Sequence, residues 1–320
     1  MVGIVPPQIE SEPTPDFNDK CLRVVQDWEA AHLPLRTAID TLQSYLQEAL
    51  DDGHFANQAR SHHIMGYIQH YGGNLTTSIH HYDQAHRLYM RVGNSKRACT
   101  IDLNQGENYR FKGDFNRARR LYQKAYEGAE SVGDLVIQTM AIGNEGLALI
   151  ALEKWDKALD ALIEGCTLCE QWTEQNARQA STQCELYQGL AVVYMAQNRL
   201  DDAWDIALQA LAIARNTSQP MDYGFANRII GEVVTKMGNS PHEDYPSDPD
   251  HYFRKALGAF RELHAEAELA RTMFAQARSL AARGRRTSAA RKLQQVMIIF
   301  TQLGMLDDAA RAAEAQLAVI

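Results

Sequence analysis

The chain has 320 residues, of which 45% are hydrophobic and 22% are charged, a composition that excludes a disordered, collagen-like or purely coiled-coil protein. Its formal net charge of −8 argues against non-specific binding to nucleic acid or to an anionic membrane, because the overall field would repel both. The five cysteines are sparse and odd in number, and the first residues show no signal-peptide pattern. We therefore expect a cytoplasmic protein without a disulfide framework.

The nine prolines divide the chain, because 35–219 and 250–320 contain none of them. Proline in a helix interior costs about 3 kcal/mol, so both proline-free ranges can be helical throughout. Residues 1–16 hold four prolines interspersed with acidic residues. Such a segment cannot bury enough apolar surface to order itself, and it is predicted to be a disordered tail.

Small residues recur at a regular spacing along the rest of the chain. The recurring positions are 66, 106, 146, 191, 231 and 277, and Gln26 stands at the corresponding place of a weaker first unit; successive positions are 40, 40, 40, 45, 40 and 46 residues apart. Glycine returns 27 residues after four of these positions, at 53, 93, 133 and 304, as is typical of a left-handed cap that ends a helix. The pattern predicts seven helical hairpins, near 17–55, 57–95, 97–136, 137–178, 182–218, 222–264 and 268–304, and a C-terminal capping helix over 305–320.

The spacing has a packing explanation. Small residues at each recurring position and twelve residues later let two antiparallel helices approach closely, and a large residue at the next turn (Tyr82, Tyr122, Leu162) fills the gap between neighbouring hairpins. One hairpin cannot bury its apolar face alone. The hairpins are therefore predicted to stack into a solenoid.

One unit carries a recognisable motif, made up of Gly106, Tyr109, Gly113, Asp114, Phe115, Ala118, Tyr122 and Ala125. This pattern resembles the tetratricopeptide repeat, and the resemblance covers about residues 17–319. The period of 40 residues and the missing closing proline make the units similar to the long repeats of kinesin light chains, Leu-Gly-Asn-type polarity adaptors, the maltose activator and the Rap phosphatases. The resemblance implies an all-α protein, a right-handed α-solenoid of about seven hairpins.

The resemblance also implies a binding groove, because the first helix of each hairpin lines the concave face in this family and contacts peptides there. The corresponding positions at the two ends of the groove are polar or aromatic except for one leucine: His63, Tyr67, His70, Tyr71, Leu103, Glu107, Arg110, Phe111, Phe225, Arg228, Glu232, Thr235, Lys236, Arg271, Phe274 and Arg278. Those in the middle are mostly apolar: Met140, Leu147, Ile150, Glu185, Gln188 and Met195. Such a surface suits an extended or helical peptide with an apolar centre.

Histidines and cysteines form two further clusters. Seven of the eleven histidines fall within 54–86, but none of them has the i, i+4 spacing of a helical zinc site. Solvated or groove-lining histidines are favoured, and a pH-sensitive contact is the alternative. Cys166 and Cys169 form a CxxC inside a predicted second helix, where buried small apolar side chains explain them better than a redox or metal site.

Seven basic residues and no acidic residue occur between Leu269 and Phe300. One hypothesis is that Arg283, Arg285 and Arg286 dock an acidic partner segment or a second copy of the chain; the alternative is an ordinary solvated helix face. The insertion at 239–250 interrupts one repeat. It carries binding specificity or is a loop that tolerates drift, and the two interpretations are evenly matched.

The chain contains no GxxxxGK[ST], GxSxG or HExxH motif and no GxGxxG that opens a strand–helix unit, so we expect no enzyme, no cofactor and no metal. The sequence instead predicts an interaction scaffold that binds a protein or peptide, and not nucleic acid or membrane, in its groove. The alternative is a regulator resembling the Rap or maltose-activator repeats, whose superhelix changes shape when a peptide or small molecule binds. A metal enzyme built on the histidine cluster is a third hypothesis. The last helix caps the solenoid or makes a contact in a homo-oligomer.

Overall fold

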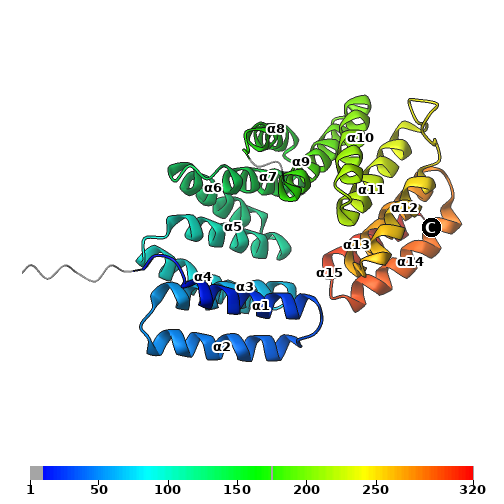
Figure 1. Cartoon of the computed structure of the whole chain (residues 1–320). Helices are drawn as coiled ribbons and strands as arrows, with labels where there is room; N and C mark the ends of the chain where they lie inside the picture. The colour runs from blue at the N-terminus through cyan, green and yellow to red at the C-terminus, as the bar shows by residue number, and fades with distance from the viewer. Residues whose placement is uncertain (1–9, 174–175, 320) are drawn as a thin grey trace, which may run out of the picture. The chain divides into compact units, whose positions relative to one another are not determined.

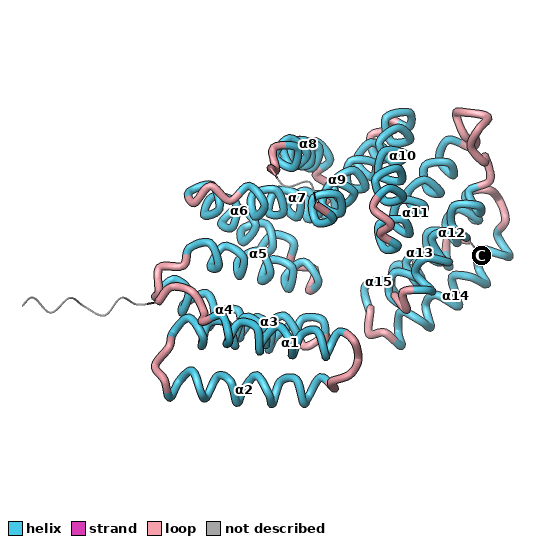
Figure 2. Tube along the Cα trace, viewed as in Figure 1, coloured by secondary structure: helices cyan, strands magenta, loops and turns pink. Residues whose placement is uncertain are grey.

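The computed structural model describes residues 10–173 and 176–319, and within these ranges all regular structure is α-helical (Figure 2). This confirms the all-α class. The helices are α1 (Pro15–Glu29), α2 (Leu35–Asp51), α3 (Phe55–Tyr71), α4 (Leu75–Arg91), α5 (Ser95–Phe111), α6 (Phe115–Ser131), α7 (Leu135–Ala151), α8 (Trp155–Glu170), α9 (Ala177–Ala196), α10 (Leu200–Asn216), α11 (Pro220–Met237), α12 (Pro249–Glu262), α13 (Glu266–Ala282), α14 (Arg286–Gln302) and α15 (Leu306–Leu317).

The helices belong to two compact units, which divide the chain after Glu153. Unit 1 contains α1–α7, and unit 2 contains α8–α15 (Figure 1). In both units each helix packs against the next one along the chain. First helices also touch one another, α1, α3, α5 and α7 in unit 1 and α9, α11, α13 and α15 in unit 2. The first helices therefore form one layer of each unit and the second helices another.

The turns explain why hairpins form at a regular interval. The predicted left-handed caps at Gly53, Gly93, Gly133 and Gly304 are confirmed, with φ between 67° and 73°. Carboxylate or amide side chains then start the next helix: Asn94 Oδ1 accepts a hydrogen bond from the backbone N–H of Arg97 at 3.1 Å, and Asp134 and Asp114 cap their helices in the same way. In these turns the helix ends at a left-handed residue and the next helix begins within a few residues.

Aromatic rings on the second helices pack onto glycines of the first. The Tyr82 ring lies so close to Gly66 that a Cβ atom at this glycine would come within 2.7 Å of it, and Tyr122 covers Gly106 in the same way. Tyr82 also shares a core cluster with Ile101 of the next hairpin. The prediction that this residue fills the gap between hairpins thus holds, but the ring also fixes the packing within its own hairpin.

The predicted N-terminal tail differs from the structure over part of its length. Helix α1 begins at Pro15, and residues 10–14 lie across the starts of α3 and α5. Glu10 contacts His54 at 2.6 Å, and Glu12 pairs with Arg97 at 2.7 Å. These carboxylates meet polar and cationic partners while Pro13 is buried, so charged contacts and apolar burial together hold the segment. The remainder of the predicted tail, residues 1–9, lies outside the described residues.

The C-terminal end of the chain matches its prediction more closely. Helix α15 packs against α14 and α13, as expected of a capping helix. The predicted hairpin at 137–178 falls on both sides of the division between the two units. In the described parts of the chain, no helix combines the length and the hydrophobicity needed to cross a bilayer.

Candidate functional site: the first-helix faces

An aromatic patch lies at the C-terminal ends of α3 and α5 in unit 1. We use this name for Tyr67, His70, Tyr71 and Phe111. The His70 ring centre is 4.8 Å from that of Tyr71 and 5.0 Å from that of Phe111, and the Tyr67 and Tyr71 ring centres are also 4.8 Å apart. Tyr71 is 64% exposed and Phe111 is 50% exposed. These two residues stand 40 positions apart, at the same place in successive repeats.

Hydrogen bonds to Glu29 and Asn108 fix the orientation of two side chains of the aromatic patch. The Tyr67 hydroxyl donates to Glu29 Oε1 at 2.6 Å, and burial together with this carboxylate raises the pKa of Tyr67. His70 Nδ1 donates to Asn108 Oδ1 at 2.7 Å, while Asn108 in turn donates to the Ser78 hydroxyl at 2.9 Å. This arrangement puts the His70 proton on Nδ1 and leaves Nε2 as an acceptor for a ligand.

Glu107 and Arg110 lie beside the patch on α5 and bind each other. Arg110 donates to Glu107 through two nitrogens, at 2.6 and 3.1 Å, and the Tyr122 hydroxyl donates to the same carboxylate. Burial alone would raise the pKa of Glu107, but Arg110 and Tyr122 hold it below its ordinary value. These two predicted groove residues therefore form a fixed, partly buried ion pair at the edge of the patch rather than two free charges.

His63 lies in the interior instead of on the predicted groove surface. Its residue is only 9% exposed, and its ring packs edge-on against Tyr82 and Tyr89, with ring centres 6.2 and 6.4 Å away. Burial lowers the pKa of His63 well below its usual range. A neutral, enclosed imidazole is a core residue and does not face a ligand on this surface, so this placement corrects the expectation for His63.

Unit 2 presents a charge ladder on its first helices. The ladder consists of alternating basic and acidic residues on α11, α13 and α15: Arg228, Glu268, Arg271, Asp308 and Arg311. Arg228 donates to Glu268 Oε2 at 2.7 Å, and Arg271 donates to the other oxygen at 2.5 Å. Arg271 also reaches Asp308 at 3.6 Å. The ladder therefore connects three successive first helices.

Sequence reasoning missed the two acids of this ladder, although a signal for them exists. Glu268 and Asp308 are each the third residue of a first helix, and Arg271 and Arg311 follow them three positions later. Residues three apart on a helix are neighbours, so each acid lies within reach of its arginine. Comparing α13 with α15 position by position, rather than judging each side chain by itself, would have found this repeated pair.

The remaining predicted residues of unit 2 lie on α11 and α13. Lys236 donates to the backbone oxygen of Met195 at 2.6 Å, which ties α11 to the end of α9. Burial raises the pKa of Glu232, while Arg228 and Arg278 oppose that rise. The exposed Arg278 lies over the Phe274 ring at 6.0 Å. Of these side chains, Arg278 and Lys236 are exposed, whereas Phe274 and Glu232 are partly buried.

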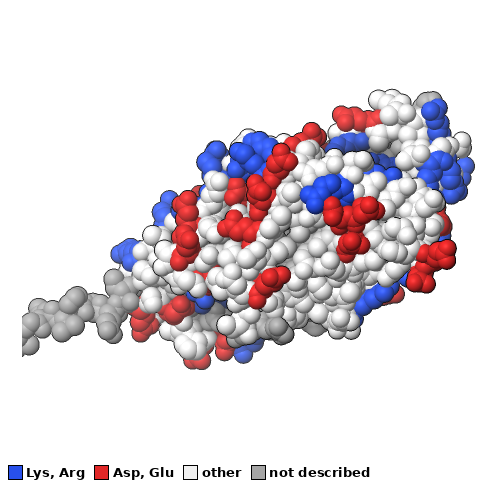
Figure 3. All heavy atoms as spheres, turned by 90° about the horizontal axis from the view of Figure 1, so that it is seen from above, with Lys and Arg blue, Asp and Glu red and all other residues white. Residues whose placement is uncertain are grey.

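The predicted basic patch is largely paired within the chain. Arg283 contacts Asp248 at 3.3 Å and Asp250 at 3.1 Å, and Arg285 contacts Asp250 at 3.5 Å. Asp248 belongs to the insertion, so two of the three arginines hold the insertion and the start of α12 in place. On the face shown in Figure 3, acidic and basic side chains are interspersed in the same manner.

Two members of the histidine cluster lie close together. Nδ1 of His62 lies 3.0 Å from Nδ1 of His81, and within residues 10–173 and 176–319 no group of three or more histidine, cysteine or acidic side chains could hold a metal ion. Cys169 is buried and Cys166 is partly buried. Burial raises the pKa of Cys166 to about 12 and that of Cys169 to about 11, so both are thiols at neutral pH.

The stacked helical hairpins with an aromatic and charged first-helix layer define a tetratricopeptide repeat (TPR) protein. A family profile described as "MalT-like TPR region" matches residues 36–233. The chain therefore belongs to the family of MalT-like TPR regions, and the resemblance found in the sequence is confirmed.

Known proteins similar to this chain share its repeat architecture. Human tetratricopeptide repeat protein 29 is 24% identical over 217 residues, which is 64% of this chain and 42% of that protein. Aspartyl phosphate phosphatase F from Bacillus subtilis superposes with a TM-score of 0.73 at 13% identity, over 89% of this chain and 70% of that one. The Rap conjugation gene regulator of plasmid pLS20, in complex with the Phr* peptide, gives 0.58 at 12% identity, over 83% and 75%. The chain spans about two fifths of the length of its curated relatives, and the structural matches show the fold alone.

Proposed function

We propose that this chain is an interaction scaffold that binds a peptide or protein segment on its first-helix faces and has no catalytic role. The aromatic patch carries the proposal. Tyr71 and Phe111 expose large rings to solvent, and such rings are the side chains that contribute most to binding energy when a partner covers them. A structural relative was solved with a peptide, which supports the same class of ligand.

The hydrogen bonds behind the patch explain how it recognises a ligand. Tyr67 and His70 are already fixed by Glu29 and Asn108, so little side-chain freedom is lost on binding. The rings of Tyr71 and Phe111 cover an apolar ligand side chain, and His70 Nε2 accepts a hydrogen bond from the ligand backbone. The patch thereby combines apolar burial with one directional contact.

Peptide phage display against the full chain, followed by fluorescence polarisation with the selected peptides, tests this proposal. We expect the double substitution Tyr71→Ala and Phe111→Ala to weaken binding at least tenfold. Leu50→Ala with Met90→Ala is the matched control, because both residues are exposed apolar side chains on second helices of the same unit. Equal losses in both double variants, or no peptide selected, would contradict the proposal.

The charge ladder favours a second candidate function, that of a signal-responsive regulator. Arg271 bridges Glu268 and Asp308, and its side chain is 37% exposed, so a ligand carboxylate can compete for it. Losing this bridge would loosen α15 from α13. Hydrogen exchange in both helices should then be faster when a selected acidic peptide binds. If protection in both helices is unchanged, the regulator function is contradicted and only the scaffold function is supported.

A further inference from the structure

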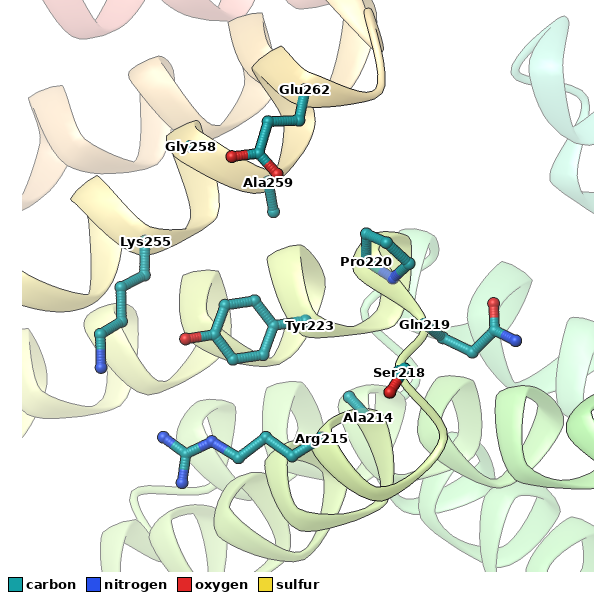
Figure 4. A pocket seen from close by; sticks show the side chains of 10 residues that line it. All are labelled: Ala214, Arg215, Ser218, Gln219, Pro220, Tyr223, Lys255, Gly258, Ala259 and Glu262. Atoms are coloured by element: carbon teal, nitrogen blue, oxygen red, sulfur yellow. The ribbon is translucent and has the colours of Figure 1, made fainter.

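A pocket of about 410 Å³ opens between the second helices α10 and α12 of unit 2, over the start of α11 (Figure 4). Its lining shares no residue with the charge ladder or with the predicted groove. The lining residues are Ala214, Arg215, Ser218, Gln219, Pro220, Tyr223, Lys255, Gly258, Ala259 and Glu262. The pocket therefore lies apart from the residues on which the proposed function depends.

One end of the pocket is cationic. Figure 4 shows the Tyr223 hydroxyl directed toward the Lys255 ammonium and the Arg215 guanidinium, with the three side chains coming from three different helices. In the described part of the chain neither Arg215 nor Lys255 is in an ion pair. Two cations and a hydroxyl that converge without a carboxylate between them form a site for an anion.

The Tyr223 ring, Pro220 and Ala259 give the pocket an apolar surface, and Ser218 and Gln219 add polar groups beside Pro220. Glu262 stands at the opposite end from Lys255 (Figure 4). These two charged residues are seven positions apart on α12, about 10 Å along a helix. A small molecule with an anionic group, an apolar body and a hydrogen-bond donor at its other end fits this order of groups.

Gly258 in the pocket wall supports the same conclusion independently. Glycine is less favourable than alanine inside a helix, so an interior glycine calls for a reason. At Gly66, Gly106, Gly224 and Gly231 the reason is an aromatic ring packed against the backbone. A Cβ atom at Gly258 would meet nothing within 4 Å. The packing of the chain does not require this glycine, whereas a ligand lying against α12 would.

We propose that this pocket binds a small organic anion. Its carboxylate or phosphate group pairs with Arg215 and Lys255 and accepts a hydrogen bond from the Tyr223 hydroxyl. Its apolar body lies on the Tyr223 ring and against the bare backbone at Gly258. The site is separate from the first-helix faces, so ligand binding here and peptide binding there can be measured independently.

Titration with phenylacetate and with phenyl phosphate, followed by ligand-observed NMR, tests the proposal on the full chain. We expect saturable binding of at least one probe, and the better probe assigns a carboxylate or a phosphate. Arg215→Gln with Lys255→Gln should weaken binding at least tenfold. Arg254→Gln with Arg261→Gln is the matched control, because it removes the same charge from exposed positions of α12 that do not line the pocket.

The substitution Gly258→Leu tests whether probe binding can be lost without a loss of stability. The open space at this position accepts a side chain, so the melting temperature should stay the same or rise while probe binding is lost. Binding that is the same in all variants, or no saturable binding of either probe to the wild type, would overturn the proposal. A loss of binding in the control variant equal to that in the pocket variant would also overturn it, because attraction by net charge would then explain the result.

Discussion

The close contact between Gly66 and the Tyr82 ring determines how near α3 and α4 approach each other. Alanine is favoured over glycine in a helix interior by about 1 kcal/mol, so an open position would gain stability from the change. At Gly66 the new Cβ atom would lie 2.7 Å from the ring, inside van der Waals contact. We expect Gly66→Ala to destabilise the protein by about 2 kcal/mol, since the core must shift to accept the methyl group.

Urea unfolding of Gly66→Ala and Gly258→Ala side by side measures this difference. The substitution is chemically the same, but only Gly66 has a ring against it. Gly258→Ala should raise the urea midpoint and Gly66→Ala should lower it. Equal shifts in the two variants would mean that helix propensity, and not packing, determines the outcome.

The His62–His81 pair makes the stability of unit 1 dependent on pH. Burial, followed by the neighbouring histidines, lowers the pKa of both to about 4, against an unfolded value of about 6.5. The unfolded chain therefore binds more protons between these values, so stability is complete above pH 6.5 and falls as the pH drops toward 4. We expect the melting temperature to decrease over this window.

A comparison of two histidine variants tests the origin of that decrease. His81→Gln removes one member of the pair and should reduce, without abolishing, the dependence of the melting temperature on pH between 6.5 and 4, because the pKa of buried His63 is also lowered. His32→Gln is the control, because His32 is exposed. If both variants keep the full slope of the wild type, other groups cause the acid sensitivity.

At the scale of the element, the start of α5 performs two functions. Asn94 caps the helix through its side-chain oxygen, and its side-chain nitrogen donates to the Ser11 carbonyl and to Glu12, both at 2.8 Å. Asp114 caps α6 through the backbone N–H of Arg117 but is exposed. Asn94→Ala should therefore cost about 2 kcal/mol and Asp114→Ala about 1 kcal/mol.

Urea denaturation of the two cap variants distinguishes the contributions. The excess loss in Asn94→Ala measures the attachment of residues 10–14, and a chain that begins after residue 14 should show equal losses in the two variants. Unequal losses in the shortened chain would show that the difference arises within α5 and not from the N-terminal segment.

Across the whole molecule, periodic features were predictable from the sequence and non-periodic ones were not. The left-handed caps at Gly93 and Gly133 follow from a backbone requirement that recurs in each repeat. The burial of His63 depends on two rings from another helix, and the pairing of Arg283 with Asp248 depends on how the insertion folds back. Contacts of this kind join residues that do not recur at a fixed spacing, so no pattern in the sequence predicts them.

The charge ladder combines periodic and non-periodic contacts. It also leads to a prediction about how stability is distributed along the chain. Glu268 accepts hydrogen bonds from Arg228 and Arg271, and its side chain is only 17% exposed. Glu268→Gln would leave two arginines facing each other without a carboxylate between them. We expect a loss of about 2 kcal/mol, below the value for a fully buried pair because Arg271 is partly solvated.

Hydrogen exchange identifies the helices that lose stability in this variant. In a solenoid each repeat contacts only its neighbours, so Glu268→Gln should reduce protection in α11, α13 and α15 and leave α3–α6 unchanged. Asp307→Asn makes the same charge change at an exposed position and should alter neither region. An equal loss of protection in both units would contradict this prediction. It would mean that the stability of unit 2 is shared with α3–α6 and does not depend on contacts between neighbouring repeats alone.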